Sequence, residues 1–143
     1  MKKFNFRLQR VLDFRHTLTK DKERELALKN HQLNEEEGKL NNILDEQNTT
    51  QIPERPMSMA EMSLTKKYIE SLQIELVKQR LIVQEAKEAV EMAREVYLEK
   101  YKEEETLNRL KDKKISEHKD EKLRSDKKEL SDMVVQRYRF SKN

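Results

Sequence analysis

The chain has 143 residues, of which 41% are charged, 34% hydrophobic and 6% aromatic, and its formal net charge is +3. A compact domain usually contains about 45–50% apolar residues, so we expect a narrow buried stripe beneath a mostly wet surface. One glycine and two prolines argue against disorder and, beside many Glu, Lys, Leu and Arg residues, predict long helices. The absence of cysteine excludes disulfides, thiolate nucleophiles and zinc–thiolate sites.

The first ten residues, MKKFNFRLQR, are basic but lead into no continuous apolar run, so we expect no signal peptide. No stretch approaches the roughly 18 apolar residues that a membrane-spanning helix needs. We therefore expect a soluble, cytoplasmic protein.

A first helix is predicted over about residues 5–48. Its apolar stripe consists of Phe4, Leu8, Val11, Leu18, Leu26, Leu33, Leu40 and Leu44. The step of eight between Leu18 and Leu26 adds one residue to the heptad, which should relax the left-handed supercoil locally. Gly38 lies inside this helix and should cost about 1 kcal/mol relative to Ala. We interpret it as a tolerated weak point rather than a site of close approach.

Residues 49–57 contain both prolines and are predicted to form an apex between two helices. Ser58 and Glu61 have the spacing of a capping box, and Met57 and Met62 that of a hydrophobic staple. These signals predict that a second helix begins at Ser58 and continues to about residue 140.

The second helix carries a heptad repeat that predicts a seam with the first helix. Its a positions are Met62, Ile69, Leu76, Val83, Val90 and Tyr97, and its d positions are Thr65, Leu72, Gln79, Ala86, Ala93, Lys100 and Leu107. The predicted fold class is therefore all-α: residues 1–143 form one long antiparallel two-helix coiled-coil hairpin whose C-terminal helix is the longer. The seam is expected at Leu26, Leu33, Ile69, Leu76, Val83, Val90 and Tyr97.

Folding the chain at the apex brings Leu40 near Ile69 and Leu44 near Met62. The same register sets Asn30 opposite Gln79. We hypothesise that these two amides form a polar layer that fixes the register, as buried polar residues do in other coiled coils.

The shorter first helix is expected to end its pairing near Leu107. Residues 111–122 then contain one apolar residue, Ile115, and are expected to be bare. Beyond them, apolar residues return at helical spacing at Leu123, Leu130, Met133, Val134, Tyr138 and Phe140. A stripe with no partner in its own chain should face another chain; the alternative is a solvated, partly frayed helix.

Catalytic chemistry is not expected. His16 and His31 are fifteen residues apart on one helix, or about 22 Å, and His118 is remote from both. The glutamate runs 35–37 and 103–105 are interpreted as solvated helix faces, because a thin hairpin offers no pocket to shift a pKa. With no glycine-rich phosphate loop either, we expect no catalytic residue, no metal site, no cofactor and no small-molecule substrate.

The charge distribution separates the chain ends from the middle. Residues 1–24 carry a net charge of +5 and residues 122–143 a net charge of +4, whereas residues 25–121 carry −6. Aromatic and basic residues interleave near the N-terminus, as in some nucleic-acid-binding surfaces: Phe4, Phe6 and Phe14 lie among Lys2, Lys3, Arg7, Arg10 and Arg15. The acidic middle would repel a phosphate backbone, so no nucleic acid is expected as a partner.

Residues 6–15, FRLQRVLDFR, resemble the opening of the FliJ family, small coiled-coil proteins of the bacterial flagellar export apparatus. The length, the absence of cysteine, the mid-chain break and the basic C-terminal arm agree with this resemblance. It implies a hairpin similar to the central stalk of rotary ATPases. It also implies that the terminal end of this hairpin sits in the hexameric flagellar export ATPase. It also implies contacts with the membrane export gate protein and with export chaperones, on the cytoplasmic face of the cell membrane.

On that resemblance, candidate residues can be assigned to each partner. The candidates for binding the ATPase are Phe6, Arg7, Leu8, Arg10, Val11, Arg15, Leu123, Leu130, Arg137 and Tyr138. The candidates for binding the export gate or chaperones lie nearer the apex and are Leu40, Leu44, Tyr68 and Leu72. Two alternatives share the same physical features: the equivalent stalk protein of a type III secretion injectisome, and a structural coiled coil that associates with itself.

Overall fold

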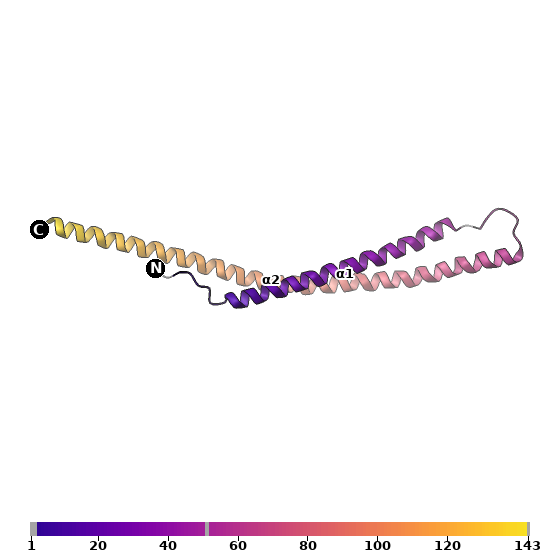
Figure 1. Cartoon of the computed structure of the whole chain (residues 1–143), viewed down its shortest axis with the longest axis horizontal. Coiled ribbons are helices and arrows are strands. Elements are labelled where there is room, and N and C mark those ends of the chain that lie inside the picture. Colours follow the sequence, from indigo (N-terminus) through magenta and orange to yellow (C-terminus); the bar gives the residue numbers. More distant parts are fainter. Residues whose placement is uncertain (1–2, 51, 143) are drawn as a thin grey trace. The chain divides into compact units, whose positions relative to one another are not determined.

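The computed structural model describes residues 3–50 and 52–142, and it contains two helices (Figure 1). Helix α1 spans Gln9–Thr49 and helix α2 spans Met59–Lys142. Glu36 contacts Gln79, whereas Glu46, later in α1, contacts Tyr68, earlier in α2, so the helices run antiparallel. The predicted fold class, an all-α antiparallel hairpin with a longer second helix, is confirmed.

The contacts divide the chain into two compact units. The apical unit is Lys20–Glu99, and the terminal unit combines Met1–Thr19 with Lys100–Asn143. No feature of the sequence marks this division, which falls inside both helices.

The connection between the helices follows the predicted signals. Helix α1 ends at Thr49, and the amide of Thr50 still donates to the carbonyl of Glu46 at 2.9 Å. Helix α2 begins at Met59, one residue after the predicted Ser58, and the Ser58 hydroxyl accepts a hydrogen bond from the Glu61 amide at 3.2 Å. This cap satisfies one of the donors that every helix start leaves without an intrahelical partner.

The α2 side of the seam is made of residues at heptad spacing. Its buried members are Leu72, Leu76, Gln79, Val83 and Val90. Its half-buried members are Thr65, Ile69, Ala86, Ala93, Tyr97, Lys100 and Leu107. Met62 differs from the other heptad residues, because 51% of it is exposed. The first turn of α2 therefore lies beyond the cover that α1 provides.

The α1 side of the seam corrects the predicted stripe. Leu12 and Thr19 are buried, whereas Val11 is exposed. The row continues with half-buried Leu26, Leu33 and Leu40, so each member lies seven residues after the last. The predicted step of eight is therefore wrong, because the row passes through Thr19 and not through Leu18.

Thr19 can occupy a seam position because its hydroxyl is satisfied. Its Oγ1 donates to the carbonyl of Arg15 at 2.9 Å and lies 3.2 Å from the carbonyl of Lys100 in α2. A buried hydroxyl costs stability only when it lacks a partner. Thr19 thus occupies the seam position that the apolar pattern assigned to Leu18.

The predicted polar layer has a different partner. Gln79 is buried as expected, but its Nε2 donates to the Glu36 carboxylate at 2.7 Å and to the Glu36 carbonyl at 3.0 Å, while Asn30 is exposed. The predicted pairings of Leu44 with Met62 and of Leu40 with Ile69 are likewise wrong, since Tyr68 meets Glu46 and Gln79 meets Glu36. Part of the connection occupies the place that the prediction gave to the end of α1, because Ile52 lines a shallow apolar pocket with Met59, Met62 and Ile69.

In the terminal unit, residues 3–8 precede α1 and are not helical, so α1 starts at Gln9 and not near residue 5. Phe6 is only 7% exposed, and the ring of Phe4 lies 5.6 Å from that of His118. Residues two apart on a helix point in different directions, so a helical start could not bring both rings onto α2. The packing of these two phenylalanines on α2 therefore explains why α1 begins only at Gln9.

This N-terminal segment also corrects the predicted end of pairing. Leu110, Ile115 and His118 are half-buried, so the stretch after Leu107 is not bare. Non-helical backbone can cover up to about 3.3 Å per residue, against 1.5 Å for a helix, so few residues reach far along α2. From residue 121 to 141, every side chain of the helix is exposed.

Gly38 lies within helical backbone, and a Cβ built on it would meet nothing within 4 Å. No close approach therefore requires a glycine at this position, in agreement with its interpretation as a weak point.

Candidate functional site

The N-terminal candidates separate into buried and exposed residues. Phe6 is buried, and Leu8 is half-buried against α2. Arg15 is also held within the terminal unit, because its guanidinium donates to the Glu103 carboxylate at 2.5 Å. These three residues shape the end of the hairpin, and their side chains offer little surface to a partner.

Arg7, Arg10 and Val11 are exposed, and the structure adds Phe14 to them. Phe14 is 63% exposed and lies three residues after Val11 and four after Arg10, spacings that place side chains on one helix face. The sequence reasoning missed Phe14 because it considered the ring only for nucleic-acid stacking. Leu12, Arg15 and Thr19 share the helix face that packs on α2, and Phe14 lies off that face. This spacing is the sequence signal that Phe14 points toward solvent.

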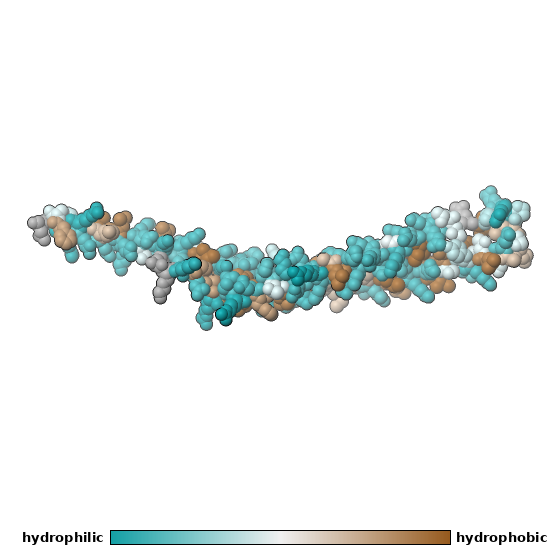
Figure 2. Space-filling model, in the orientation of Figure 1, coloured by the Kyte–Doolittle hydropathy of each residue, from teal (hydrophilic) through white to brown (hydrophobic). Residues whose placement is uncertain are grey.

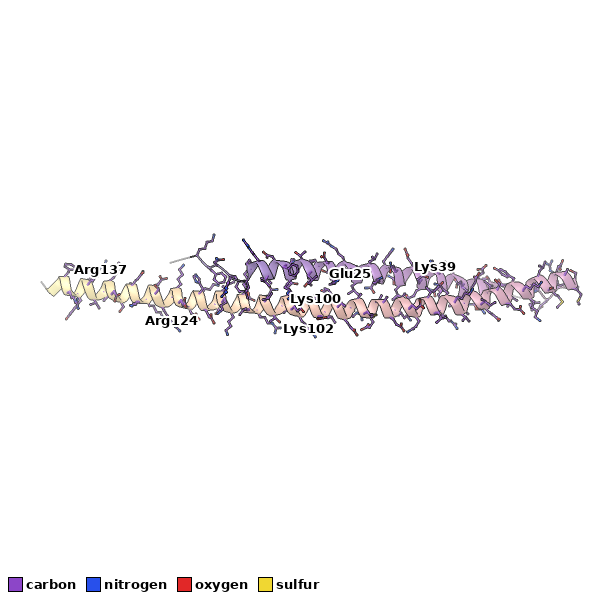
Figure 3. All side chains as sticks on the ribbon, turned by 90° about the horizontal axis from the view of Figure 1, so that it is seen from below. Glu25, Lys39, Lys100, Lys102, Arg124 and Arg137 are labelled. Carbon is purple, nitrogen blue, oxygen red and sulfur yellow. The ribbon has the colours of Figure 1, made fainter. Side chains whose placement is uncertain are left out.

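The C-terminal candidates are all exposed. Leu123, Leu130, Arg137 and Tyr138 lie on the stretch of α2 from 121 to 141, together with Met133, Val134, Val135 and Phe140. Figure 2 shows hydrophobic residues interrupting the hydrophilic surface of this stretch, and Figure 3 shows Arg124 and Arg137 extending from it into solvent. The helix thus presents apolar and cationic side chains along the same length.

The candidates near the apex mostly belong to the seam. Leu72 is buried, and Leu40 and Leu44 are half-buried. Tyr68 is exposed, and its hydroxyl donates to the Glu46 carboxylate, a contact that raises the pKa of the tyrosine. Of these four, Tyr68 has the most surface for a partner.

An apolar patch on the apical unit was also missed. Ile74, Val77 and Leu81 are exposed on α2, at spacings of three and four residues. They escaped notice because the heptad analysis followed the stronger row through Leu72 and Leu76. A second row on the same helix becomes visible only once the first has been assigned to the seam.

The three histidines lie beside other side chains, two of them beside carboxylates and one beside a phenyl ring. His16 lies 2.6 Å from Glu104 and His31 lies 3.0 Å from Glu35. Within the described part of the chain, no group of three or more His, Asp or Glu side chains could hold a metal ion. Neither helix, over the residues described, has a stretch both long and apolar enough to cross a membrane.

Comparison with known families identifies the chain. The family model described as flagellar FliJ protein matches residues 4–143. Neither the curated proteins nor the solved structures contain a match. The family match extends over nearly the whole chain and includes the N-terminal motif, both helices and the exposed C-terminal stretch. The chain therefore belongs to the FliJ family and is a component of the flagellar protein export apparatus.

Proposed function

We propose that this chain is a non-enzymatic central stalk of the flagellar export ATPase, with the terminal unit as the end that enters the hexameric ring. The observation that carries the proposal is the C-terminal stretch of α2. It is helical through residue 142, yet every side chain from 121 to 141 is exposed. A stripe of large apolar residues is costly to leave in water, which favours a partner protein as its cover.

The charges of this unit indicate what the partner surface must offer. Arg7, Arg10, Arg124 and Arg137 are exposed, and none of them forms an ion pair within the described residues. A ring lined with acidic side chains would attract this end, speed the encounter and lose that advantage at high salt. The acidic middle of the chain would be repelled, so charge alone would orient the stalk.

Apolar anchors supply the second part of the proposed contact. Phe14 and Val11 lie beside Arg10 on α1, and Tyr138 and Phe140 lie beside Arg137 and Arg139 on α2. Exposed aromatic and arginine side chains are the types that dominate the energy of protein interfaces. The basic surface would steer the stalk, and these residues would hold it.

The apical unit would then extend toward the export gate protein and the export chaperones, at the cytoplasmic face of the membrane. Tyr68 is the candidate from the sequence that fits this role best, because Leu40, Leu44 and Leu72 stabilise the hairpin itself. A partner that approaches Tyr68 would compete for its hydrogen bond with Glu46.

The test is stimulation of the purified export ATPase by the full chain. We expect Arg7→Glu/Arg10→Glu to reduce stimulation by about tenfold or more at low salt, because it replaces two attractive contacts by repulsion. Arg15 is left unchanged, since a glutamate there would face Glu103 and disturb folding. Circular dichroism checks that the variant is folded.

The matched control is Arg55→Glu/Lys87→Glu, which makes the same change in charge on exposed residues of the apical unit. It should leave stimulation within about twofold of the wild type. Equal losses in the two variants would show that net charge, and not the terminal unit, governs the effect. Full stimulation by Arg7→Glu/Arg10→Glu would overturn the proposal.

A further inference from the structure

The patch formed by Ile74, Val77 and Leu81 has no role in the hairpin. These residues are 57%, 61% and 60% exposed, although neighbouring Leu72 and Leu76 are buried in the seam. Their spacing places them on one face of α2, on the side turned away from α1. Ile74 and Val77 line a shallow groove together with Glu70, Gln73 and Lys78, and Leu81 lies one helical turn further along the same face.

The charges that flank this patch have opposite signs at its two ends. Lys66 and Lys67 precede it, and Glu85 and Glu88 follow it. All four side chains are exposed, and none forms an ion pair with another described residue. A helix that covers the patch must therefore present acidic residues at one end and basic residues at the other.

We propose that this patch is an interface between two copies of the chain, packed antiparallel about a twofold axis at the level of Val77 and Lys78. Lys67 lies ten residues before Val77, and Glu88 lies ten residues after Lys78. The symmetry therefore sets each lysine opposite a glutamate of the other copy. Ile74 likewise faces Leu81, and the two Val77 side chains meet at the axis.

The same charges exclude the parallel arrangement of two copies. A parallel pair would set Lys67 against Lys67 and Glu88 against Glu88, and like charges in register destabilise a helical pair. The antiparallel pair contains two unfavourable levels related by the axis, because Glu70 of each copy faces Glu85 of the other. Lys67 lies one helical turn from Glu70 and reduces that repulsion.

The size of the patch sets the strength of the association. Three apolar side chains per copy form a contact well below the usual size of a stable interface, so the dimer is weak and concentration-dependent. Both copies keep the seam between α1 and α2, because none of the three residues belongs to it. The inference goes beyond the proposed stalk function, since it concerns the apical unit and uses no residue assigned to the ATPase.

The first test uses the absence of cysteine from the chain. A symmetric axis brings two copies of one residue together, so Val77→Cys should form a disulfide-linked dimer on mild oxidation of the full chain. The matched control is Leu28→Cys, because Leu28 is also exposed but lies on α1. We expect at least about tenfold more dimer from Val77→Cys than from the control. This factor corresponds to about 1.4 kcal/mol in the free energy of bringing the two thiols together. Equal yields from the two variants would overturn the interface.

The second test is sedimentation equilibrium over a wide range of concentration. Leu81→Asp should weaken self-association by about tenfold or more, whereas Leu130→Asp on the C-terminal stretch should not change it. Lys67→Glu and Glu88→Lys should each weaken the dimer, and the double exchange Lys67→Glu/Glu88→Lys should restore it, because the pairs are then reversed. A strictly monomeric wild type, a loss with Leu130→Asp alone, or no rescue in the double variant would refute the proposal.

Discussion

Helix α2 carries an apolar stripe in two stretches that differ in their surroundings. Between residues 72 and 90, Leu72, Leu76, Val83 and Val90 are buried against α1. Between residues 121 and 141, Leu123, Leu130 and Val134 have similar spacing but are exposed. The comparison teaches that periodicity predicts an amphipathic helix, whereas the partner that covers it must be found elsewhere. In one stretch that partner is in the same chain, and in the other it is proposed to be a second protein.

The largest expected effect comes from truncating one leucine in each stretch. Leu76→Ala should lower the free energy of unfolding by about 2–3 kcal/mol, because it leaves a cavity in the seam. Leu130→Ala should change it by less than about 0.5 kcal/mol, because the side chain is exposed in the free protein. Urea denaturation followed by circular dichroism measures both values. Equal losses would mean that the C-terminal stretch is covered in solution.

Gly38→Ala should have a smaller effect of opposite sign. The added methyl group meets nothing within 4 Å, so the variant should stabilise the apical unit by about 0.5–1 kcal/mol through lower backbone entropy in the unfolded chain. Ser125→Ala is the control on the exposed stretch, and its effect on the same unfolding transition should be negligible. A loss of stability in Gly38→Ala would show that a close approach forms at this position in solution.

The smallest expected effect concerns Glu36 and acid. The hydrogen bond from Gln79, and then the one from Lys39, lower the pKa of Glu36 below the ordinary value of a glutamate. A lowered pKa in the folded state contributes stability that is present above the unfolded pKa and lost as the pH falls through the folded pKa. We expect Gln79→Leu to reduce this acid sensitivity.

Melting temperatures between about pH 6 and pH 3 test the role of Glu36, with Gln32→Leu as the control because Gln32 is an exposed glutamine of α1. The acid-induced shift in melting temperature should be smaller in Gln79→Leu than in the wild type and unchanged in Gln32→Leu. If all three proteins lose the same number of degrees, the contact between Gln79 and Glu36 does not contribute to stability at neutral pH.

The sequence was sufficient to predict the hairpin, its break and the start of α2. Two prolines, the Ser58 cap and the row through Leu76 and Val83 each act locally or repeat over many turns, so they do not depend on distant contacts. The register could not be predicted, because it depends on which polar residues the seam accepts. Thr19 and Gln79 are tolerated there only through hydrogen bonds to the opposite helix, and no pattern of apolar residues contains that information.

The exposure of the candidate residues was predicted only in part, for a related reason. Arg7, Arg10, Leu123 and Leu130 are exposed, as a contact with a partner protein requires. Phe6 was assigned to the same surface, yet it is buried because residues 3–6 leave the helical path. Arg15 faces α2 and Phe14 faces solvent, although they are neighbours in the sequence. Which of two such neighbours is exposed can be decided only when the position of the opposite helix is known.

The hairpin topology has a consequence for the order in which the contacts form. Tyr68 and Glu46 are 22 residues apart in the sequence, Gln79 and Glu36 are 43 apart, and Arg15 and Glu103 are 88 apart. Each doubling of a loop adds about 0.6 kcal/mol of closure entropy, so contacts near the apex are expected to form first and to nucleate those behind them. The packing of Phe4 and Phe6 on α2 would then form last and be lost first. The contacts of the terminal unit, which is proposed to enter the ATPase ring, are thus expected to be the easiest in the hairpin to break.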